Sequence, residues 1–396
     1  MLAVDDAQQR ILALAEPLGA ETLPVAEAAG RYLAEPIAAR RNQPPADNSA
    51  MDGFAIRYDD LPGPWRIVGE SRAGHPFAGT VGQGEAAAIS TGALVPEGAD
   101  VILVREDGVR DGEHLALSGE GPGERGRHIR RAGSDFREGM VLLKAGRALT
   151  PGALALAISA GVGSVSVGRR PRLAILSTGS ELAAPGSNVA AHRIYDSNGP
   201  MLTAMAAGLC ADIRHVHAVE DDEAAVRAAI CGASDADVLL TVGGASVGDH
   251  DHVKAALTAE GADIDFWKVA MKPGKPLIAG RLGTQALLGL PGNPGSAFVT
   301  ATVFLLPLLR HLAGAGAPMP PMGQARLLAD LPVGGTRTEY WRAALSAEGL
   351  QPLTGQSSGL VSSLAAADTL IPRAAGANAV KAGDLVRYIA LNQGSA

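Results

Sequence analysis

The segment 241–251, TVGGASVGDHD, has the composition of an anion-binding loop with added carboxylates. It follows an apolar run and contains Gly243, Gly244, Ser246, Gly248, Asp249 and Asp251. Glycines let a phosphate approach the backbone closely, and the first turn of a following helix offers free N–H groups. A phosphate alone would be repelled by the acids. The segment therefore predicts a phosphorylated ligand that is bridged by a divalent cation.

Three further loops place polar residues at or directly after apolar, strand-like runs. The first contributes Ser177, Thr178, Gly179 and Glu181 around the end of 173–177. The second contributes Lys268, Lys272 and Lys275 around 266–270. The third contributes Pro291, Gly292, Asn293 and Pro294 after 286–290. Loops that leave the carboxyl ends of parallel strands meet at one rim of a sheet. Lysines there could hold phosphates, while Glu181 and Asp251 could hold the metal. Taken singly, each residue also fits a turn, a first-turn helix acid or a solvated charge.

The elements that would position these loops alternate between strand and helix. We expect strands at 173–177, 213–219, 238–242, 266–270 and 286–290, and helices at 200–209, 222–233, 252–260 and 296–312. This order predicts a doubly wound, mostly parallel sheet with helices on both faces.

The flanking segments have other patterns. Helical spacing occurs at 4–15, 25–33 and 150–160, and short strand-like runs separated by Gly, Pro and Asp occur at 54–58, 65–69, 86–91, 101–106, 340–345 and 385–390. Such runs favour β-rich parts on either side of the α/β domain. From their local sequence, Asp52 (in NSAMDG) and Asp135 (in RAGSDF) are expected to be turn-forming residues.

Composition limits the remaining classes of function. A net charge of −7 argues against nucleic acid as the main partner. The N-terminus lacks a signal-peptide pattern, and the apolar run 296–312 is interrupted by Pro307 and is too short to span a membrane. Cys210 and Cys231 have no metal-binding spacing and are expected to be core thiols. We therefore expect a cytoplasmic protein.

Eight segments together carry a family resemblance. They are PPADNSAMDGFAI (44–56), STGALVPEGAD (90–100), RRAGSDF (130–136), STGSEL (177–182), IYDSNGPML (194–202), GGASVGDHD (243–251), FWKVAMKPGKP (266–276) and GLPGNPGSA (289–297). In this order they resemble the molybdopterin molybdenumtransferase, or MoeA, family, to which the gephyrin E domain is related. Ala245 and Gly295 depart from the commonest pattern, but each is a small-for-small change.

The resemblance implies an activity and its requirements. Members insert molybdate into adenylylated molybdopterin, release AMP and require Mg²⁺ or another divalent cation. They form elongated homodimers in which the active site is shared between subunits. A molybdopterin adenylyltransferase and downstream cofactor carriers or molybdoenzymes are implied as possible partners, and neither nucleic acid nor membrane is implied.

The resemblance also implies four domains: a helical connector from 1–42 and 138–170, a β-rich insertion at 43–137, the α/β molybdopterin-binding domain at 171–315, and a small C-terminal β-barrel-like domain at 322–396. The family's catalytic acids fall on Asp52, Asp135, Glu181, Asp221 and Asp251. Thr91, Lys268, Lys272, Pro291 and Pro294 match further functional positions. In such a dimer, the first two acids of one subunit would complete a site with the other three of the second subunit.

Two other functions stay open at this point. A molybdopterin adenylyltransferase resembles residues 173–312 alone and would need neither flanking β domain. A non-enzymatic pterin-binding scaffold would use the α/β pocket without depending on the acids.

Overall fold

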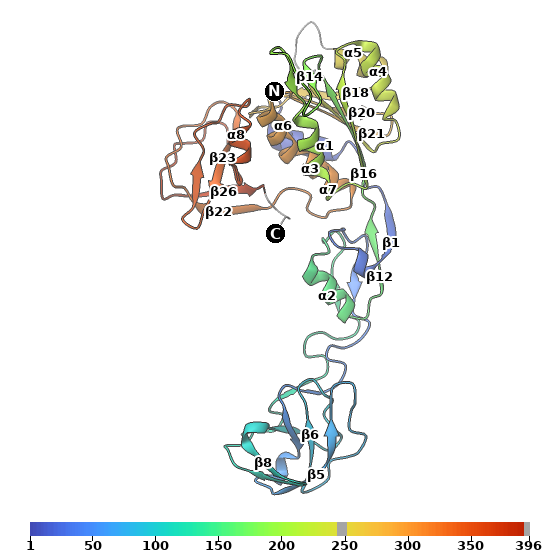
Figure 1. Cartoon of the computed structure of the whole chain (residues 1–396), viewed down its shortest axis with the longest axis vertical. Helices are drawn as coiled ribbons and strands as arrows, with labels where there is room; N and C mark the ends of the chain where they lie inside the picture. Colours follow the sequence, from blue (N-terminus) through green and yellow to red (C-terminus); the bar gives the residue numbers. More distant parts are fainter. Residues whose placement is uncertain (244–251, 392–396) are drawn as a thin grey trace.

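The structure, a computed structural model, describes residues 1–243 and 252–391 and is multidomain (Figure 1). The α/β region lies at one end of an elongated molecule, with the C-terminal β region beside it. The β-rich insertion lies at the opposite end, and a narrow connector joins the two ends. The α/β, connector, insertion and C-terminal regions each have a buried core.

The α/β sheet contains six strands in the order β16-β13-β17-β21-β20-β18. Their bounds are β16 Asp212–Val219, β13 Arg172–Thr178, β17 Val238–Val242, β21 Gln285–Leu290, β20 Pro276–Leu282 and β18 Asp263–Lys268. The first four are parallel. Strand β20 is antiparallel to both β21 and β18, so β18 runs in the same direction as the parallel four. The expected mostly parallel sheet is present, but β20 was missed by the sequence prediction.

Side chains point alternately to the two faces of the sheet along each strand, and helices cover both faces. Leu173 and Ile175 pack in one core with α3 (Asn198–Ala206) and the helices of 294–312, whereas Ala174 and Leu176 pack in the other with α4 (Glu223–Gly232) and α5 (His252–Ala259). Central strands buried on both faces require the continuous apolar runs seen in the sequence.

The helix after β21 continues through a proline. It consists of α6 Pro294–Thr300, a π-helical turn at Ala301–Leu305 and α7 Leu306–Leu312. Pro307 has no N–H to donate to the carbonyl of Val303, and the Nε2 of Gln8 donates to that oxygen instead, at 3.1 Å. The 19-residue run is long and apolar enough to cross a membrane, but 78% of its most apolar window is buried. It is therefore the core helix of the α/β region.

The N-terminal segment differs from the prediction in two respects. Helix α1 (Val4–Leu12) forms as expected, but it packs in the α/β core although residues 1–42 were assigned to the connector. The expected helix at 25–33 is wrong, since only the 3-10 turn Val25–Glu27 is helical there. Directly before it, β1 (Ala20–Pro24) pairs antiparallel with β12 (Ser164–Gly168). Within 25–33, Gly30 adopts a positive φ of 71° that interrupts helical geometry.

The connector contains one longer helix, α2 (Pro151–Ser159), as expected. The Thr150 hydroxyl accepts a hydrogen bond from the N–H of Ala153 and caps it. Two antiparallel pairs of short strands lead from the connector to the insertion. They are β2 (Ile37–Ala38) with β11 (Val141–Leu143), and β3 (Asn48–Ser49) with β10 (Ile129–Arg130).

The insertion is a six-stranded sheet in the order β7-β4-β6-β5-β9-β8. The strands are β4 Gly53–Ile56, β5 Trp65–Ser71, β6 Glu85–Ile89, β7 Val101–Val104, β8 Gly108–Asp111 and β9 His114–Leu117, with 3-10 turns at Tyr58–Asp60 and Arg105–Asp107. Strands β4 to β7 match the four predicted runs, whereas β8 and β9 were not predicted as strands. The sheet holds its own apolar core around Trp65.

The C-terminal sheet has the order β19-β23-β25-β26-β22. Its strands are β22 Met322–Arg326, β23 Thr338–Leu345, β25 Thr369–Arg373 and β26 Leu385–Ala390, with β24 Leu350–Pro352 paired to β23 and the short helix α8 at Ser362–Ala365. The edge strand β19 (Met271–Lys272) comes from the α/β part of the chain. This strand ties the C-terminal region to the α/β region.

Candidate functional site

The loops after β13, β17 and β21 meet at one rim of the α/β sheet. Ser177 pairs with Val242, and Val242 pairs with Leu290, so the three strands end side by side. Ser177 and Thr178 are buried at this edge. The N–H of Gly243 donates to the Leu290 carbonyl at 3.3 Å, which continues the contact beyond the strands.

Close backbone approach at this rim requires glycine at position 243. Gly243 has a φ of +94°, and a Cβ there would lie 2.5 Å from the carbonyl oxygen of Thr178. A Cβ at Gly292 would lie 3.6 Å from the Cα of Gly243. The backbones of three loops are thus in direct contact at the position where a ligand phosphate was predicted. Gly244, Ser246, Gly248, Asp249 and Asp251 lie outside the described residues.

Glu181 lies at the same rim and is exposed. Its carboxylate folds back over Gly179, where a Cβ would lie 2.5 Å from Glu181 Oε2. No helix follows it, since strand β14 (Leu182–Ala183) begins at the next residue and pairs with β15 (Ile194–Tyr195). The alternative in which Glu181 is a first-turn helix acid is therefore wrong. Among the described residues it forms no ion pair, so its oxygens are available to a ligand.

Asp221 is brought next to the Glu181 loop. It follows β16 and is exposed, and its N–H donates to the hydroxyl of Ser180 at 3.3 Å. Two of the predicted acids, Glu181 and Asp221, thus come from neighbouring loops of one rim. An oxygen-only set of exposed carboxylates suits Mg²⁺, which keeps several waters and takes one or two carboxylates.

The three predicted lysines divide between two places. Lys268 ends β18 and is exposed at the same edge as the parallel strands, and the carbonyl of the exposed Lys275 accepts the N–H of Val269 at 3.0 Å. Lys272 lies instead on β19 in the C-terminal sheet, and its Nζ is 3.4 Å from Glu339 Oε1. The expected loop 271–276 therefore contains the short strand β19, and substrate binding by Lys272 stays a prediction.

Glu339 is a buried carboxylate in this contact. Burial alone would raise its pKa, but the hydrogen bond from Trp341 Nε1 at 3.1 Å and the charge of Lys272 outweigh that effect. The pKa of Glu339 therefore lies below its usual range, so Glu339 is a carboxylate when it contacts Lys272.

The loop 291–294, which contains Pro291 and Pro294, is held on two sides by Asn198 and Ser358, and the sequence motifs did not indicate either of these two residues as functional. The side-chain amide of Asn198 donates to the carbonyl of Gly292 at 2.7 Å, and that of Asn293 donates to the hydroxyl of Ser358 at 3.3 Å. Pro291 is buried, and Pro294 is the first residue of α6. The one available signal for Asn198 was its place in the 194–202 segment. Nothing local marked Ser358.

Two predicted residues of the insertion form one unit. The carboxylate of Asp52 accepts hydrogen bonds from the N–H of Thr91 at 2.6 Å and from its hydroxyl at 2.8 Å. These bonds hold the pKa of Asp52 below its usual range. Asp135 is exposed in the loop between β10 and β11, and its N–H donates to the carbonyl of Gln43 at 2.9 Å.

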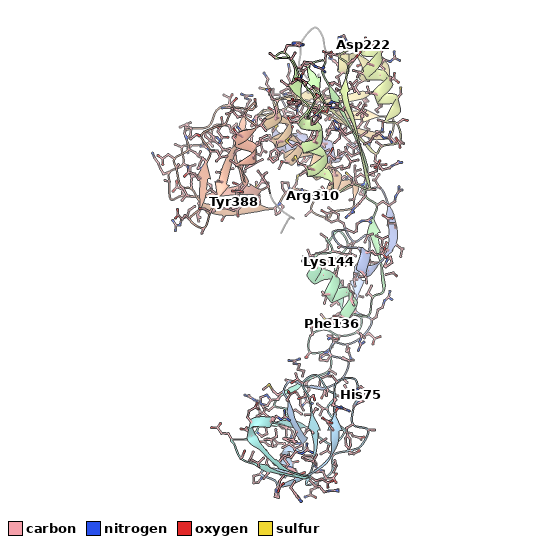
Figure 2. The ribbon with its side chains drawn as sticks, viewed as in Figure 1. His75, Phe136, Lys144, Asp222, Arg310 and Tyr388 are labelled. Carbon is pink, nitrogen blue, oxygen red and sulfur yellow. The ribbon has the colours of Figure 1, made fainter. Side chains whose placement is uncertain are left out.

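Within one chain the two groups of acids are far apart. Figure 2 shows Asp222 at the tip of the α/β region and Phe136 at the far end of the connector, where the insertion begins. Asp135 is the sequence neighbour of Phe136, and Asp52 directly precedes β4 in the insertion sheet. The fold of one chain therefore does not bring Asp52 and Asp135 to the rim that holds Glu181 and Asp221.

Three family models match successive parts of the chain. The model described as "MoeA N-terminal region (domain I and II)" matches residues 2–161, "Probable molybdopterin binding domain" matches 174–311, and "MoeA C-terminal region (domain IV)" matches 324–391. A curated relative from Haemophilus influenzae, named molybdopterin molybdenumtransferase, is 38% identical over 318 residues, which are 79% of this chain and 78% of the relative. The chain belongs to the molybdopterin molybdenumtransferase family.

Further comparisons agree with this membership of the molybdopterin molybdenumtransferase family. A relative of the same name from Staphylococcus aureus (strain COL) is 30% identical and covers 98% of this chain and 95% of its own length. A solved structure titled as the molybdopterin biosynthesis moea protein from Pyrococcus horikosii aligns over 100% of both chains, with 28% identity and a TM-score of 0.80. The molybdopterin-binding model spans the rim described above.

Proposed function

We propose that this protein inserts molybdate into adenylylated molybdopterin and releases AMP, with Mg²⁺ or another divalent cation in the site. The chain is a transferase of molybdenum cofactor biosynthesis by its family. The observation that carries the finer proposal is the rim itself. There, the closely packed backbones at Thr178, Gly243 and Gly292 lie at the same rim as the exposed carboxylates of Glu181 and Asp221.

The chemistry of this reaction matches the residues at the rim. Release of AMP breaks the bridging P–O bond of a phosphoanhydride, while an oxygen of water or molybdate forms a new bond to phosphorus. Negative charge builds on the departing phosphate, and Lys268 and Lys275 at the same edge supply positive charge. Molybdate is a tetrahedral dianion, for which backbone N–H groups and lysines are also suitable hosts.

A divalent cation would be held by Glu181, together with Asp251 outside the described residues. When bound, such an ion neutralises phosphate charge and activates oxygen nucleophiles. The protein's own residues orient the ligand, because Gly243, Gly292 and the buried Ser177–Thr178 pair fix the shape of the rim. Asp221 then remains free to hold a proton at its carboxylate or to contact the substrate.

The same proposal includes a homodimer with a shared site, in the cytoplasm. Its support is the distance between the insertion acids and the rim in one chain (Figures 1 and 2). A second subunit placed alongside in the opposite sense could bring its Asp52–Thr91 unit and Asp135 over the rim. The four domains expected from the sequence, at 1–42 with 138–170, 43–137, 171–315 and 322–396, are part of this proposal, except that α1 (Val4–Leu12) packs in the α/β core. An adenylyltransferase and cofactor carriers are proposed as transient partners.

The deciding experiment supplies purified protein with adenylylated molybdopterin and follows AMP. We expect AMP release and active cofactor only when both molybdate and Mg²⁺ are present, and loss of both products in Glu181→Gln. If the protein instead accumulates adenylylated pterin from molybdopterin, ATP and Mg²⁺ without molybdate, it is an adenylyltransferase. Tight pterin binding with no AMP release under any of these conditions would make it a scaffold.

A further inference from the structure

Three side chains with metal-binding atoms converge beside the outer strand of the α/β sheet: Asp196, His215 and His217. One ligand atom from each lies within 4.8 Å of the others. Asp196 Oδ2 is 3.1 Å from His215 Nε2 and 3.0 Å from His217 Nδ1. We propose that these three residues form a site for one borderline divalent transition-metal ion of the Zn²⁺ class, separate from the proposed Mg²⁺ site.

The spacing of these atoms is close to that of a metal coordination shell. Ligands placed at about 2.05 Å from a tetrahedral Zn²⁺ lie about 3.3 Å from one another. The two separations from Asp196 Oδ2 are within about 0.3 Å of this value. The two nitrogens lie within 4.8 Å of each other, so side-chain movements would place the oxygen and both nitrogens around one ion.

The backbone holds the three ligands in place before any ion binds. His215 and His217 are two positions apart on β16, so both rings project from the same face of the strand. Asp196 follows β15, and its Oδ1 accepts the N–H of Gly199 at 3.0 Å. A Cβ at Gly199 would lie 2.1 Å from His215 Nε2, so only glycine lets this ring reach the carboxylate.

Charge favours a cation at this position. The Asp196 side chain is 1% exposed, and among the described residues its ion-pair partners are His215 and His217, with no lysine or arginine. A buried carboxylate is costly unless charge or hydrogen bonds compensate it, and a bound cation would add to the hydrogen bonds that Asp196 already accepts. The side chains of His215 and His217 are 20% and 31% exposed, which leaves a path from solvent to the cluster.

The donor set selects the class of metal. Imidazole nitrogens suit Zn²⁺, Co²⁺, Ni²⁺ and Cu²⁺, whereas Mg²⁺ prefers an all-oxygen shell. Three protein ligands leave a fourth position for water or for the hydroxyl of Ser177, which is 2.9 Å from His215 Nε2. The ion would join the start of α3 to β13 and to the edge strand β16.

The test titrates Co²⁺ into the metal-stripped full-length protein without pterin, so its result does not depend on the proposed function. We expect ligand-field absorption that saturates at one ion per chain, persists in excess Mg²⁺ and disappears on addition of Zn²⁺. Loss of even an outer-shell partner typically weakens a metal site by about 10–100-fold. His215→Gln and His217→Gln should therefore weaken Co²⁺ binding by at least about 100-fold.

The control is His75→Gln, which changes an exposed histidine in the distant insertion (Figure 2) and should leave Co²⁺ affinity unchanged. X-ray absorption of the Zn²⁺-loaded wild-type protein needs no variant and should show two imidazole ligands. The proposal is overturned by an oxygen-only or sulfur-containing shell. It is equally overturned by Co²⁺ binding that does not saturate, or that His75→Gln reduces as much as the other substitutions.

Discussion

The Asp52 carboxylate is held by Thr91, which donates both its N–H, at 2.6 Å, and its hydroxyl, at 2.8 Å. Thirty-nine positions separate the two residues, and the antiparallel pairing of β4 with β6 brings them together. Both bonds favour the charged carboxylate and fix its direction. Asp52 and Thr91 therefore act as one unit at the end of the insertion sheet.

Replacing Thr91 by valine should remove one of these bonds and keep the other. The backbone N–H remains, but Asp52 loses the hydroxyl donor that orients it. We expect molybdate-dependent AMP release to fall by about tenfold in kcat, with the protein still folded. Thr91→Ser should restore most of the rate because it returns the hydroxyl. A valine variant with the wild-type rate would mean that the hydroxyl bond has no part in the reaction.

A shared active site makes a specific prediction for mixed dimers. Dimers of one Asp52→Asn chain and one Glu181→Gln chain, isolated through two affinity tags, should have about half of the wild-type AMP release. One of their two sites would contain both substitutions, and the other would be intact. If each site were built from one chain, both sites would be damaged and the mixed dimer would be inactive.

In the matched control, a shared site predicts no activity and a single-chain site predicts about half of the wild-type activity, which is the reverse of the first mixed dimer. Pairing a wild-type chain with a chain that carries both Asp52→Asn and Glu181→Gln damages both sites when they are shared, and only one site when they are not. We expect this dimer to be inactive. Failure of the two tags to co-purify would contradict the homodimer itself.

The sequence was informative where burial imposes a periodic pattern. Strands β13, β17 and β21 are buried on both faces, and their uninterrupted apolar runs predicted them and the rim that follows. The segment 25–33 was misjudged because Val25, Ala26, Ala28 and Ala29 favour a helix locally. Pairing of Leu33 with Val167 and the positive φ of Gly30 override that preference.

Contacts that depend on distant segments could not be predicted from local pattern. His215 and His217 are visible as an i, i+2 pair, but the carboxylate that they face lies 19 and 21 positions earlier, just before α3. Nothing in the sequence indicated that Lys272 contacts Glu339, because that contact depends on the pairing of β19 with β23. In both cases the contacting residue comes from a segment that is distant in the sequence.

The Glu339–Lys272 contact predicts how stability responds to acid. The pKa of Glu339 is lowered in the folded protein, so its contribution to stability is complete above the unfolded value of 4.5 and is lost as pH falls below it. Glu339→Gln should therefore unfold at a midpoint that depends less on pH between about 5 and 3 than that of the wild type. Thermal unfolding followed by circular dichroism across this range measures the difference.

The control for this prediction is Glu348→Gln, which makes the same chemical change at an exposed residue between β23 and β24. It should keep the acid dependence of the wild-type protein. Equal slopes for the wild type and Glu339→Gln would show that the carboxylate is not stabilised by Trp341 and Lys272 on folding.

The contact between Gln8 and Val303 predicts a coupling between the N-terminal helix and the proline of the core helix. Gln8 donates to the carbonyl of Val303, whose usual α-helical donor is missing at Pro307, so Gln8→Ala removes this hydrogen bond from a part-buried acceptor. We expect a loss of about 1–2 kcal/mol in the free energy of unfolding, measured in urea. The exposed neighbour substitution Gln9→Ala should change this free energy by less than about 0.5 kcal/mol.

A double-mutant cycle with Pro307→Ala separates this hydrogen bond from the general packing of α1. Alanine at 307 regains an N–H that can donate to the carbonyl of Val303, so that carbonyl no longer depends on the side chain of Gln8. In the Pro307→Ala background, Gln8→Ala should therefore cost about 1 kcal/mol less than in the wild type. Equal costs in the two backgrounds would assign the effect of Gln8 to packing, because packing against the core helix does not depend on the N–H at 307.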